Sequence, residues 1–147
     1  ATPNDRNDPD KLKNNIIPYS LNNHIHEREV SFHLQREINF MPHVADFFRG
    51  ILITGNFSLR NQCSLQETRN IFDDFYDEHS FIVVKEEFPS ISEVINTPNA
   101  MIGGFNIDKS KKRLSFCCSI DNLLKGAASQ AIQNLNNAMN FDEKLGL

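Results

Sequence analysis

Two apolar runs separated by a short charged segment constrain the fold of this chain more than any other feature of its sequence. Residues Ala100–Ile107 and Leu114–Ile120 are rich in apolar residues, and Asp108–Arg113 between them is charged and polar. This arrangement is typical of a β-hairpin. Every second residue of the later run is apolar, so one face of that strand is suited to a core. The chain is therefore expected to contain an antiparallel strand pair with one buried face.

Two further segments extend the expected sheet beyond the hairpin. Phe81–Val84 is a short apolar run, which is typical of a buried strand. Residues 51–58 alternate with a period of two, which also indicates a strand. One of its faces carries Ile51, Ile53, Gly55 and Phe57, and the wetter face carries Leu52, Thr54, Asn56 and Ser58.

The first two expected helices are read from apolar spacing and from one capping signal. Val30 and Leu34 lie one turn apart, which predicts a short helix over residues 28–36. Ser64 and Glu67 have the spacing of a capping box, in which each side chain bonds the other residue's backbone N–H. The apolar stripe expected on the helix that follows is Leu65, Thr68, Phe72, Phe75, Tyr76 and His79.

The last expected helix spans about residues 123–139, with Asp121 and Asn122 where an N-cap belongs. Its expected apolar side is Leu124, Ala128, Ala131, Ile132, Leu135 and Met139. With the strands between the helices, the element order predicts an α+β fold with a mixed, mostly antiparallel sheet and helices on one face.

Composition excludes several classes of protein. A chain of 147 residues is expected to form a single domain over residues 1–147, with residues 1–15 as a loop or arm. Its net charge of −4 argues against a general nucleic-acid binder. No apolar run is long enough to cross a bilayer. The three cysteines suggest no disulfide framework and fit a reducing compartment, and no Cys/His spacing suits zinc, so no metal is expected.

The first segment with chemical potential is a cluster of histidines and carboxylates at a loop-to-helix junction. His24, His26 and Glu29 fall within six residues. Imidazole transfers protons near neutral pH, and a helix starting near His26 would place Glu29 one turn further on the same face. A polar, solvated helix start explains the same residues, and a metal site is a third interpretation without an evident third ligand.

The second segment is a loop leading into the strand that starts at Ile51, punctuated by Pro42 and Gly50. Arg49 at its end is suited to a bidentate pair with a carboxylate or phosphate. An ordinary surface or interface ion pair is the alternative for Arg49. For His43 the alternative to a binding role is a hydrogen-bonded structural histidine.

The third segment is the start of the last helix, where small residues fill the first turns. Asn122, Lys125 and Gly126 lie there. Such a helix can approach a ligand closely, and its free amides suit an anion or a cofactor amide. A tightly packed helix is the alternative, and the two interpretations do not exclude each other.

Taken together, these segments resemble the N-acetyl-gamma-glutamyl-phosphate reductase family. Its His-x-His-x-x-Glu motif is matched by His24, His26 and Glu29, and the order and separation of the motifs agree over nearly the whole chain. Where many members have Arg-His-x-Pro, this chain has Ile25-His26-Glu27-Arg28, a form that resembles fungal mitochondrial members made with an acetylglutamate kinase. The other matched positions are Phe40, Pro42, His43, Arg49–Leu52, Thr54, Asp121–Leu123, Lys125–Ala128, Gln130, Ala131, Gln133, Asn134, Phe141–Glu143, Gly146 and Leu147.

The resemblance implies a C-terminal substrate and dimerisation part of an NADP-dependent reductase of arginine biosynthesis. It implies that residues 122–140 pack on an NADP-binding domain absent from this chain, which also supplies the cysteine nucleophile, so the chain alone is expected to be inactive. The homo-oligomer expected is a dimer or tetramer with its contact on the sheet. The mitochondrial matrix is the expected location, with the cytoplasm as the alternative.

The resemblance also implies roles for individual residues. His26 is the expected acid/base residue, His24 is its rival, and Glu29 would orient the imidazole or the substrate. Arg49 and His43 are expected at the small-molecule substrate. The residues expected near NADP are Asn122, Lys125 and Gly126.

Two other functions stay open at this point. The chain could be a non-catalytic interaction or dimerisation module that regulates a kinase partner such as acetylglutamate kinase. It could also belong to an aspartate-semialdehyde dehydrogenase-like enzyme, because those enzymes share an Asp-Asn-x-x-Lys-Gly-Ala-Ala segment. The His-x-His-x-x-Glu motif argues against the second alternative.

Overall fold

The structure is a computed structural model of the 147-residue chain, and it describes residue 4 and residues 8–147. The chain divides into two compact units, Ala1–Phe48 and Arg49–Leu147. The arm expected over residues 1–15 lies partly outside the described residues, at 1–3 and 5–7. Within its described part a short helix forms, α1 (Pro9–Leu12), because the Asp8 carboxylate caps it by accepting from the backbone N–H of Asp10.

The first unit also contains a two-stranded antiparallel pair that the sequence analysis missed. It is formed by β1 (Ile16–Pro18) and β2 (His43–Ala45). The helix expected over residues 28–36 is α2 (Ile25–Leu34), which begins three residues earlier. The earlier start has a local cause, since the His24 side chain accepts a hydrogen bond from the backbone N–H of His26 and acts as the N-cap.

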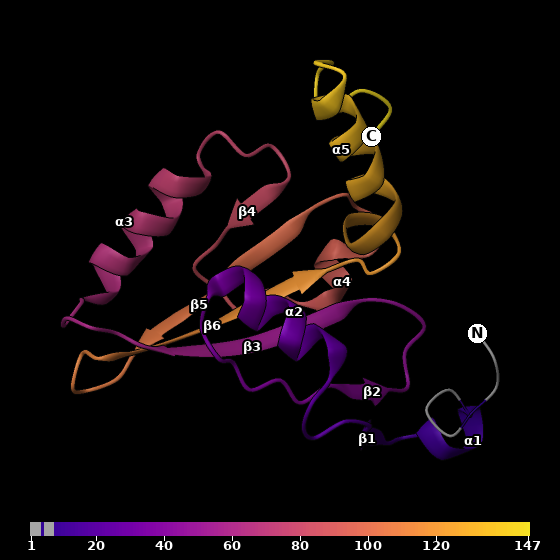
Figure 1. Ribbon diagram of the computed structural model, residues 1–147, viewed down its shortest axis with the longest axis horizontal. Coiled ribbons are helices and arrows are strands. Elements are labelled where there is room, and N and C mark those ends of the chain that lie inside the picture. Colours follow the sequence, from indigo (N-terminus) through magenta and orange to yellow (C-terminus); the bar gives the residue numbers. More distant parts are fainter. Residues whose placement is uncertain (1–3, 5–7) are drawn as a thin grey trace. The chain divides into compact units, whose positions relative to one another are not determined.

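The second unit is built on a four-stranded sheet with the order β3-β6-β5-β4 (Figure 1). The strands are β3 (Ile51–Ser58), β4 (Ile82–Val84), β5 (Ala100–Ile107) and β6 (Arg113–Ile120). β4 runs parallel to β5, whereas the β5–β6 and β6–β3 pairs are antiparallel. The predicted hairpin and the α+β fold with a mixed, mostly antiparallel sheet are therefore confirmed.

The core of this unit lies between the sheet and helix α3 (Leu65–Tyr76). Ile102, Phe105 and Leu114 form its buried cluster, and Phe72 and Tyr76 of α3 pack against them. The predicted capping box is present, because Ser64 and Glu67 each accept from the other's backbone N–H. The predicted stripe was too wide. Leu65 and Phe75 lie outside the face that meets the sheet and are 49% and 68% exposed.

The last helix is not the single α-helix expected over residues 123–139. It starts as a π-helical turn, η1 (Leu124–Ala128), and continues as α5 (Ser129–Ala138). Its expected apolar side is largely exposed, with Leu135 60% accessible. The buried side is polar instead, because the Asn136 amide donates to the backbone carbonyls of Glu143 and Leu145 and so ties the C-terminal segment to α5.

One short helix between β4 and β5 was missed, although Ser90 and Glu93 have the spacing of a capping box. It is α4 (Ile91–Val94), and its last side chain, Val94, is fully buried. Apolar burial of this kind fixes the position of the loop that follows. That loop contains Asn96, a residue of the site described below.

Candidate functional site

The first unit gathers the two predicted histidines at the N-terminus of α2. The His24 ring lies 4.8 Å from that of His26 and 5.3 Å from that of Phe40, measured between centroids. Tyr19 meets His24 edge-on at 5.7 Å, and His26 meets Phe40 at 6.1 Å. The sequence-predicted pair therefore lies in one aromatic cluster.

The two imidazoles in this cluster differ in their hydrogen bonding. The Nδ1 atom of His24 accepts the backbone N–H of His26 at 3.2 Å. An acceptor nitrogen carries no proton, so this bond requires a neutral His24 ring with its proton on Nε2. The His26 ring is exposed, and no hydrogen bond to it is found among the described residues. Of the two imidazoles, only that of His24 has a hydrogen-bond partner among the described residues.

The predicted carboxylate partner, Glu29, lies one turn after His26 in α2 and is exposed. The neighbouring Glu27, which was not among the predicted site residues, is the carboxylate that builds the cluster. It accepts from the backbone N–H of Asn23 at 3.2 Å and from that of Phe40 at 3.0 Å. Glu27 thus brings the Phe40 ring to the start of α2.

His43 lies apart from this cluster in its local contacts. It is exposed on β2, and its Nδ1 lies 3.0 Å from the backbone carbonyl oxygen of Met41. Because a carbonyl only accepts, Nδ1 is the donor in this contact. The substrate role of His43 stays a prediction.

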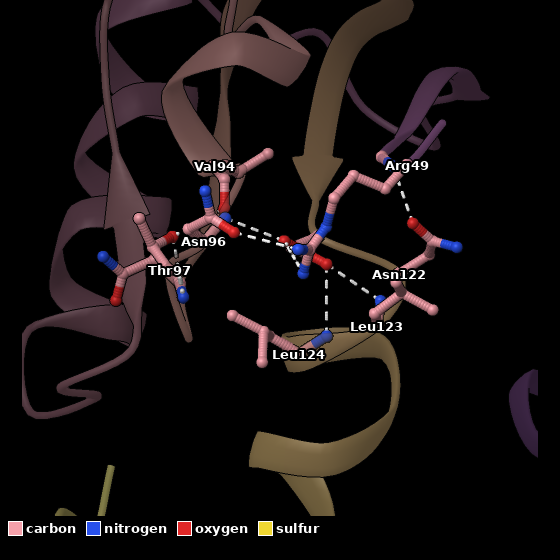
Figure 2. A network of polar contacts seen from close by, with 10 residues as sticks. Arg49, Val94, Asn96, Thr97, Asn122, Leu123 and Leu124 are labelled. Atoms are coloured by element: carbon pink, nitrogen blue, oxygen red, sulfur yellow. Dashed lines mark hydrogen bonds and ion pairs between the residues drawn. The ribbon is translucent and has the colours of Figure 1, made fainter. Parts of the chain in front are cut away.

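The second unit contains a buried ion pair between Arg49 and Asp121 (Figure 2). The Arg49 Nη2 atom lies 2.6 Å from Asp121 Oδ2, and the Asp121 side chain is fully buried. Arg49 Nη1 also donates to the side-chain oxygen of Asn96 at 2.9 Å. The head group of Arg49 is therefore held between a carboxylate and an amide oxygen.

Asp121 accepts hydrogen bonds on both of its carboxylate oxygens. Oδ2 accepts the backbone N–H of Asn96 at 2.8 Å, and Oδ1 accepts those of Leu123 and Leu124 at 2.9 and 3.2 Å. Burial raises the pKa of Asp121, but the bonds from Arg49 and from the three N–H groups lower it by more, and the pKa falls to about 2. Asp121 is thus a carboxylate whose charge is compensated inside the unit.

Asn122 follows Asp121 and is the predicted cofactor residue with the most suitable geometry. Its side-chain oxygen accepts the backbone N–H of Gly50 at 2.6 Å. Asn122 is only partly buried, and its side-chain NH₂ has no partner among the described residues. One amide donor therefore remains available at the junction between β6 and η1.

Lys125 and Gly126, the other two predicted cofactor residues, are engaged within the second unit. Lys125 Nζ donates to Gln133 at 2.7 Å and lies 5.4 Å from the centre of the Phe81 ring. Burial lowers the pKa of Lys125 more than the nearby Glu143 raises it. The Gly126 N–H donates to the Asp121 carbonyl at 2.9 Å, which forms the first π-helical bond. Their cofactor roles stay predictions.

None of the three cysteines has the surroundings of an activated nucleophile. All three thiols are free, and burial, helped by the neighbouring Cys117, raises the pKa of Cys118. A raised pKa disfavours the thiolate, which is the reactive form. Cys63 lies before α3, with its sulfur 3.3 Å from the Thr68 hydroxyl oxygen. Among the residues that the structure describes, no group of three metal-ligating side chains is found, and no helix is long and apolar enough to cross a membrane.

Comparison with known protein families identifies the family of this chain. Residues 1–122 match the model of the semialdehyde dehydrogenase, dimerisation domain. The chain belongs to this family. The match ends at Asn122, so it includes the histidine cluster, Arg49 and Asp121, and stops before η1.

Several curated relatives of this dimerisation domain are similar over its whole length. Protein arg-6, mitochondrial, of Neurospora crassa is 46% identical over 99% of the chain, and Protein arg11, mitochondrial, of Schizosaccharomyces pombe is 43% identical over 99%. The N-acetyl-gamma-glutamyl-phosphate reductase of Xanthomonas axonopodis is 41% identical over all of it. The chain spans 17% and 16% of the two fungal proteins and 46% of the bacterial one.

Solved structures of the same kind share the fold. Aspartate semialdehyde dehydrogenase II from Vibrio cholerae, complexed with ASA, matches 88% of the chain with a TM-score of 0.70, and the chain covers 42% of it. The corresponding enzyme of Francisella tularensis matches 87% with a TM-score of 0.65, and the chain covers 40% of it. Their sequence identities of 16% and 14% limit this likeness to the fold.

The residues that organise this dimerisation domain were only partly visible in the sequence. Asp121 was expected at the N-cap, but the residue at that position is Leu123, and Asp121 instead accepts the backbone N–H groups of Leu123 and Leu124. The pairing of Asp121 with Arg49 was not foreseen. Asn96 was missed together with the four-residue helix before it, whose capping-box residues Ser90 and Glu93 were not used as a signal. Its one signal is that asparagine tolerates the left-handed backbone conformation, and Asn96 has a φ of 63°.

Proposed function

We propose that this chain is the substrate-binding and dimerisation part of an N-acetyl-gamma-glutamyl-phosphate reductase, which converts the acyl phosphate to N-acetylglutamate semialdehyde with NADPH. The observation that carries the proposal is the 41% identity over the whole chain to a reductase of that name. The aspartate-semialdehyde dehydrogenases share the fold at only 12–16% identity, so they support the architecture and not the substrate.

The histidine cluster would serve the proton transfer of this reaction. His26 is exposed on the first turn of α2, and its ring makes no hydrogen bond among the described residues that would hold its proton elsewhere. His24 fixes the start of that turn by accepting the His26 N–H. In the proposed mechanism His26 exchanges a proton with the reacting oxygen of the substrate, and Glu29 on the same helix orients the imidazole or the substrate.

The chemistry of the second unit fits a nicotinamide cofactor. The free side-chain NH₂ of Asn122 would hold a carbonyl oxygen such as that of the carboxamide, and Lys125 and Gly126 follow it in η1. NADPH supplies the hydride when bound. The exposed apolar side of α5, with Leu135 and Met139 60% and 56% accessible, supports our proposal that residues 122–140 pack on the NADP-binding domain. That domain would also provide the cysteine nucleophile.

A domain replacement tests the proposed substrate. Residues 1–147 would replace the matching segment of the Xanthomonas axonopodis reductase, to which they are 41% identical over 147 residues. We expect the chimera to reduce NADP in the presence of phosphate and N-acetylglutamate semialdehyde, and to ignore aspartate semialdehyde. The 147-residue chain by itself is expected to show no turnover, because it has no activated thiol.

Two results would contradict the proposal. One is turnover by the isolated chain, and the other is a chimera that prefers aspartate semialdehyde. Gel filtration and NADP binding by the chimera separate these results from a failure to fold.

Further partners follow from the same proposal. The fungal relatives bear the word mitochondrial in their names. We therefore propose the mitochondrial matrix as the location, with the cytoplasm as the alternative, and acetylglutamate kinase as a partner of the complete enzyme.

The sheet is the proposed contact between subunits of the homo-oligomer. The edge strand β3 carries apolar side chains that the second unit leaves open, with Ile51 41%, Ile53 45% and Phe57 46% exposed. They pair with Ile120, Cys118 and Leu114 of β6, respectively. The three β3 side chains therefore lie on the apolar face of the hairpin. α3 covers the β4 and β5 part of this unit's core and leaves β3 open. An open apolar strand of this kind is suited to a second copy of the chain.

We expect the chain to self-associate at micromolar concentration, and Ile53→Asp to weaken this association about tenfold or more, because it replaces a buried apolar contact with a charge. Sedimentation velocity over a concentration series measures the effect. Thr54→Asp is the matched control, since Thr54 is also exposed on β3 but points to the opposite face. A monomeric unmodified chain, or an equal loss in the control, would rule out this contact.

A further inference from the structure

We propose that Arg49 and Asp121 are positioning residues that aim the side-chain NH₂ of Asn122 at the carbonyl acceptor of the cofactor. This inference rests on the proposed function, because it concerns the same nicotinamide site. It gives Arg49 a role in cofactor binding through Asn122, in place of direct contact with the substrate.

The first step is that two consecutive residues, Arg49 and Gly50, bond two consecutive residues far away in the sequence, Asp121 and Asn122. Arg49 pairs with Asp121 through side chains, and the next residue on each side, Gly50 and Asn122, pair through a backbone N–H and a side-chain oxygen. The second of these bonds joins residues 72 positions apart. The ion pair is therefore directly followed along both segments by the bond between Gly50 and Asn122.

The second step concerns which groups remain free for a ligand. The carboxylate of Asp121 is fully buried and already accepts from Arg49 and from three backbone N–H groups. Arg49 donates a hydrogen bond from Nη1 to Asn96, and its Nη2 atom pairs with Asp121. The Nε atom is buried without a partner among the described residues. The Arg49 side chain is only 19% exposed, so a substrate carboxylate has little access to the N–H groups that the contacts with Asn96 and Asp121 leave unused. Positioning is thus the role that the contacts support.

The third step fixes the orientation of the Asn122 amide. An amide side chain has one accepting oxygen and one donating NH₂. The group facing it is the N–H of Gly50, which only donates, so the oxygen must point to Gly50 and the NH₂ must point away. The free end of Asn122 is therefore a donor, and it selects a carbonyl oxygen over another donor.

The fourth step is that the backbone of the arrangement is itself specified by sequence. Gly50 has a φ of 111°, and a Cβ there would lie 2.2 Å from Cγ2 of Ile91. Only glycine brings the N–H close enough to meet Asn122. Asn96, with a φ of 63°, donates its backbone N–H to Asp121, and its side-chain oxygen accepts a hydrogen bond from Arg49. Three separate segments thus converge on one pair of charges.

The test uses the complete reductase that contains this chain and measures the NADP dissociation constant by fluorescence titration, with the KM for each substrate. Asn122→Ala should raise the dissociation constant roughly 3- to 10-fold, the effect of one lost hydrogen bond. Arg49→Met should raise it in the same direction while leaving the KM for N-acetylglutamate semialdehyde unchanged. In the double variant the two effects should not add, because Arg49 acts through Asn122.

Two further variants complete the design. Arg49→Lys keeps a charge for Asp121 and should recover part of the affinity. Arg69→Met removes an arginine from the exposed Arg69–Asp73 pair of α3. This variant should change neither the NADP dissociation constant nor the KM for any substrate. If Arg49→Met prevents folding, Asn96→Gly removes only the amide that holds the Arg49 head group, keeps the backbone bond, and should raise the dissociation constant to a smaller degree.

The outcomes separate the inference from the proposed function. If Asn122→Ala leaves NADP binding unchanged, the proposed cofactor site is wrong. If Asn122→Ala weakens binding but Arg49→Met does not, or if their effects add, Arg49 is no positioning residue. If Arg49→Met raises only the KM for the semialdehyde, Arg49 contacts the substrate directly.

Discussion

His26→Gln should lower kcat of the complete reductase by roughly 10²- to 10⁴-fold, the usual contribution of a positioned general acid or base. The expectation rests on the different hydrogen bonding and exposure of the two imidazoles. The His24 ring accepts a backbone N–H and is thereby committed to one tautomer, whereas the His26 ring is exposed on the first turn of α2. Glutamine keeps a polar side chain of similar reach but cannot transfer a proton, so stability should change little. Steady-state kinetics across pH measure the loss.

His24→Asn is the matched control for this prediction. Asparagine is one of the best N-cap residues, so this variant removes an imidazole but keeps an acceptor for the His26 N–H. We expect it to lose far less activity than His26→Gln. If His24→Asn is the more damaging variant, the acid/base role belongs to His24. If neither variant loses more than a few-fold, the motif is a capped, solvated helix start and has no part in proton transfer.

The parts of this fold that could be predicted from sequence are those determined by neighbouring residues. The β5–β6 hairpin needs only alternation and a polar turn, and the α3 cap needs only Ser64 and Glu67 three positions apart. The π-helical start of the last helix is different. It depends on the Asp121 carbonyl accepting the N–H of Gly126 while the Asp121 carboxylate takes those of Leu123 and Leu124. No periodicity of apolar residues reports such a shift by one residue.

The candidate site shows the same division between local and distant information. The sequence marks Arg49, Gly50, Asp121 and Asn122 in two separate motifs, but nothing local indicates that one motif bonds the other. The apolar side of the last helix was predicted from residue spacing, and Leu135 on that side is 60% exposed in this chain. An apolar helix face shows that a contact exists in some assembly, and it does not show which chain segment supplies the other side.

Asp121→Asn should be the most destabilising single change in the second unit, at about 3–5 kcal/mol of unfolding free energy, because it leaves the Arg49 charge buried without its counterion. The new side-chain NH₂ would also face N–H groups that it cannot bond. Denaturant titration of the 147-residue chain measures the loss. Asp73→Asn removes the acid of an exposed pair on α3 and should cost less than about 1 kcal/mol. The double change Arg49→Met with Asp121→Asn should cost less than the sum of the two, since it also removes the stranded charge.

The same carboxylate predicts how stability depends on pH. The pKa of Asp121 is lowered from 3.8 to about 2 in the folded chain, so the folded state binds the proton less readily than the unfolded state. Its contribution is therefore complete above the unfolded pKa near 4 and disappears as the pH falls towards 2. Other acids of the chain, such as Glu93, titrate in the same range, so the informative quantity is the difference between the unmodified chain and Asp121→Asn. We expect that difference to shrink steadily below pH 4 and to be smallest near pH 2. A difference that stays constant over this range would show that Asp121 contributes shape and hydrogen bonds to the site but no charge.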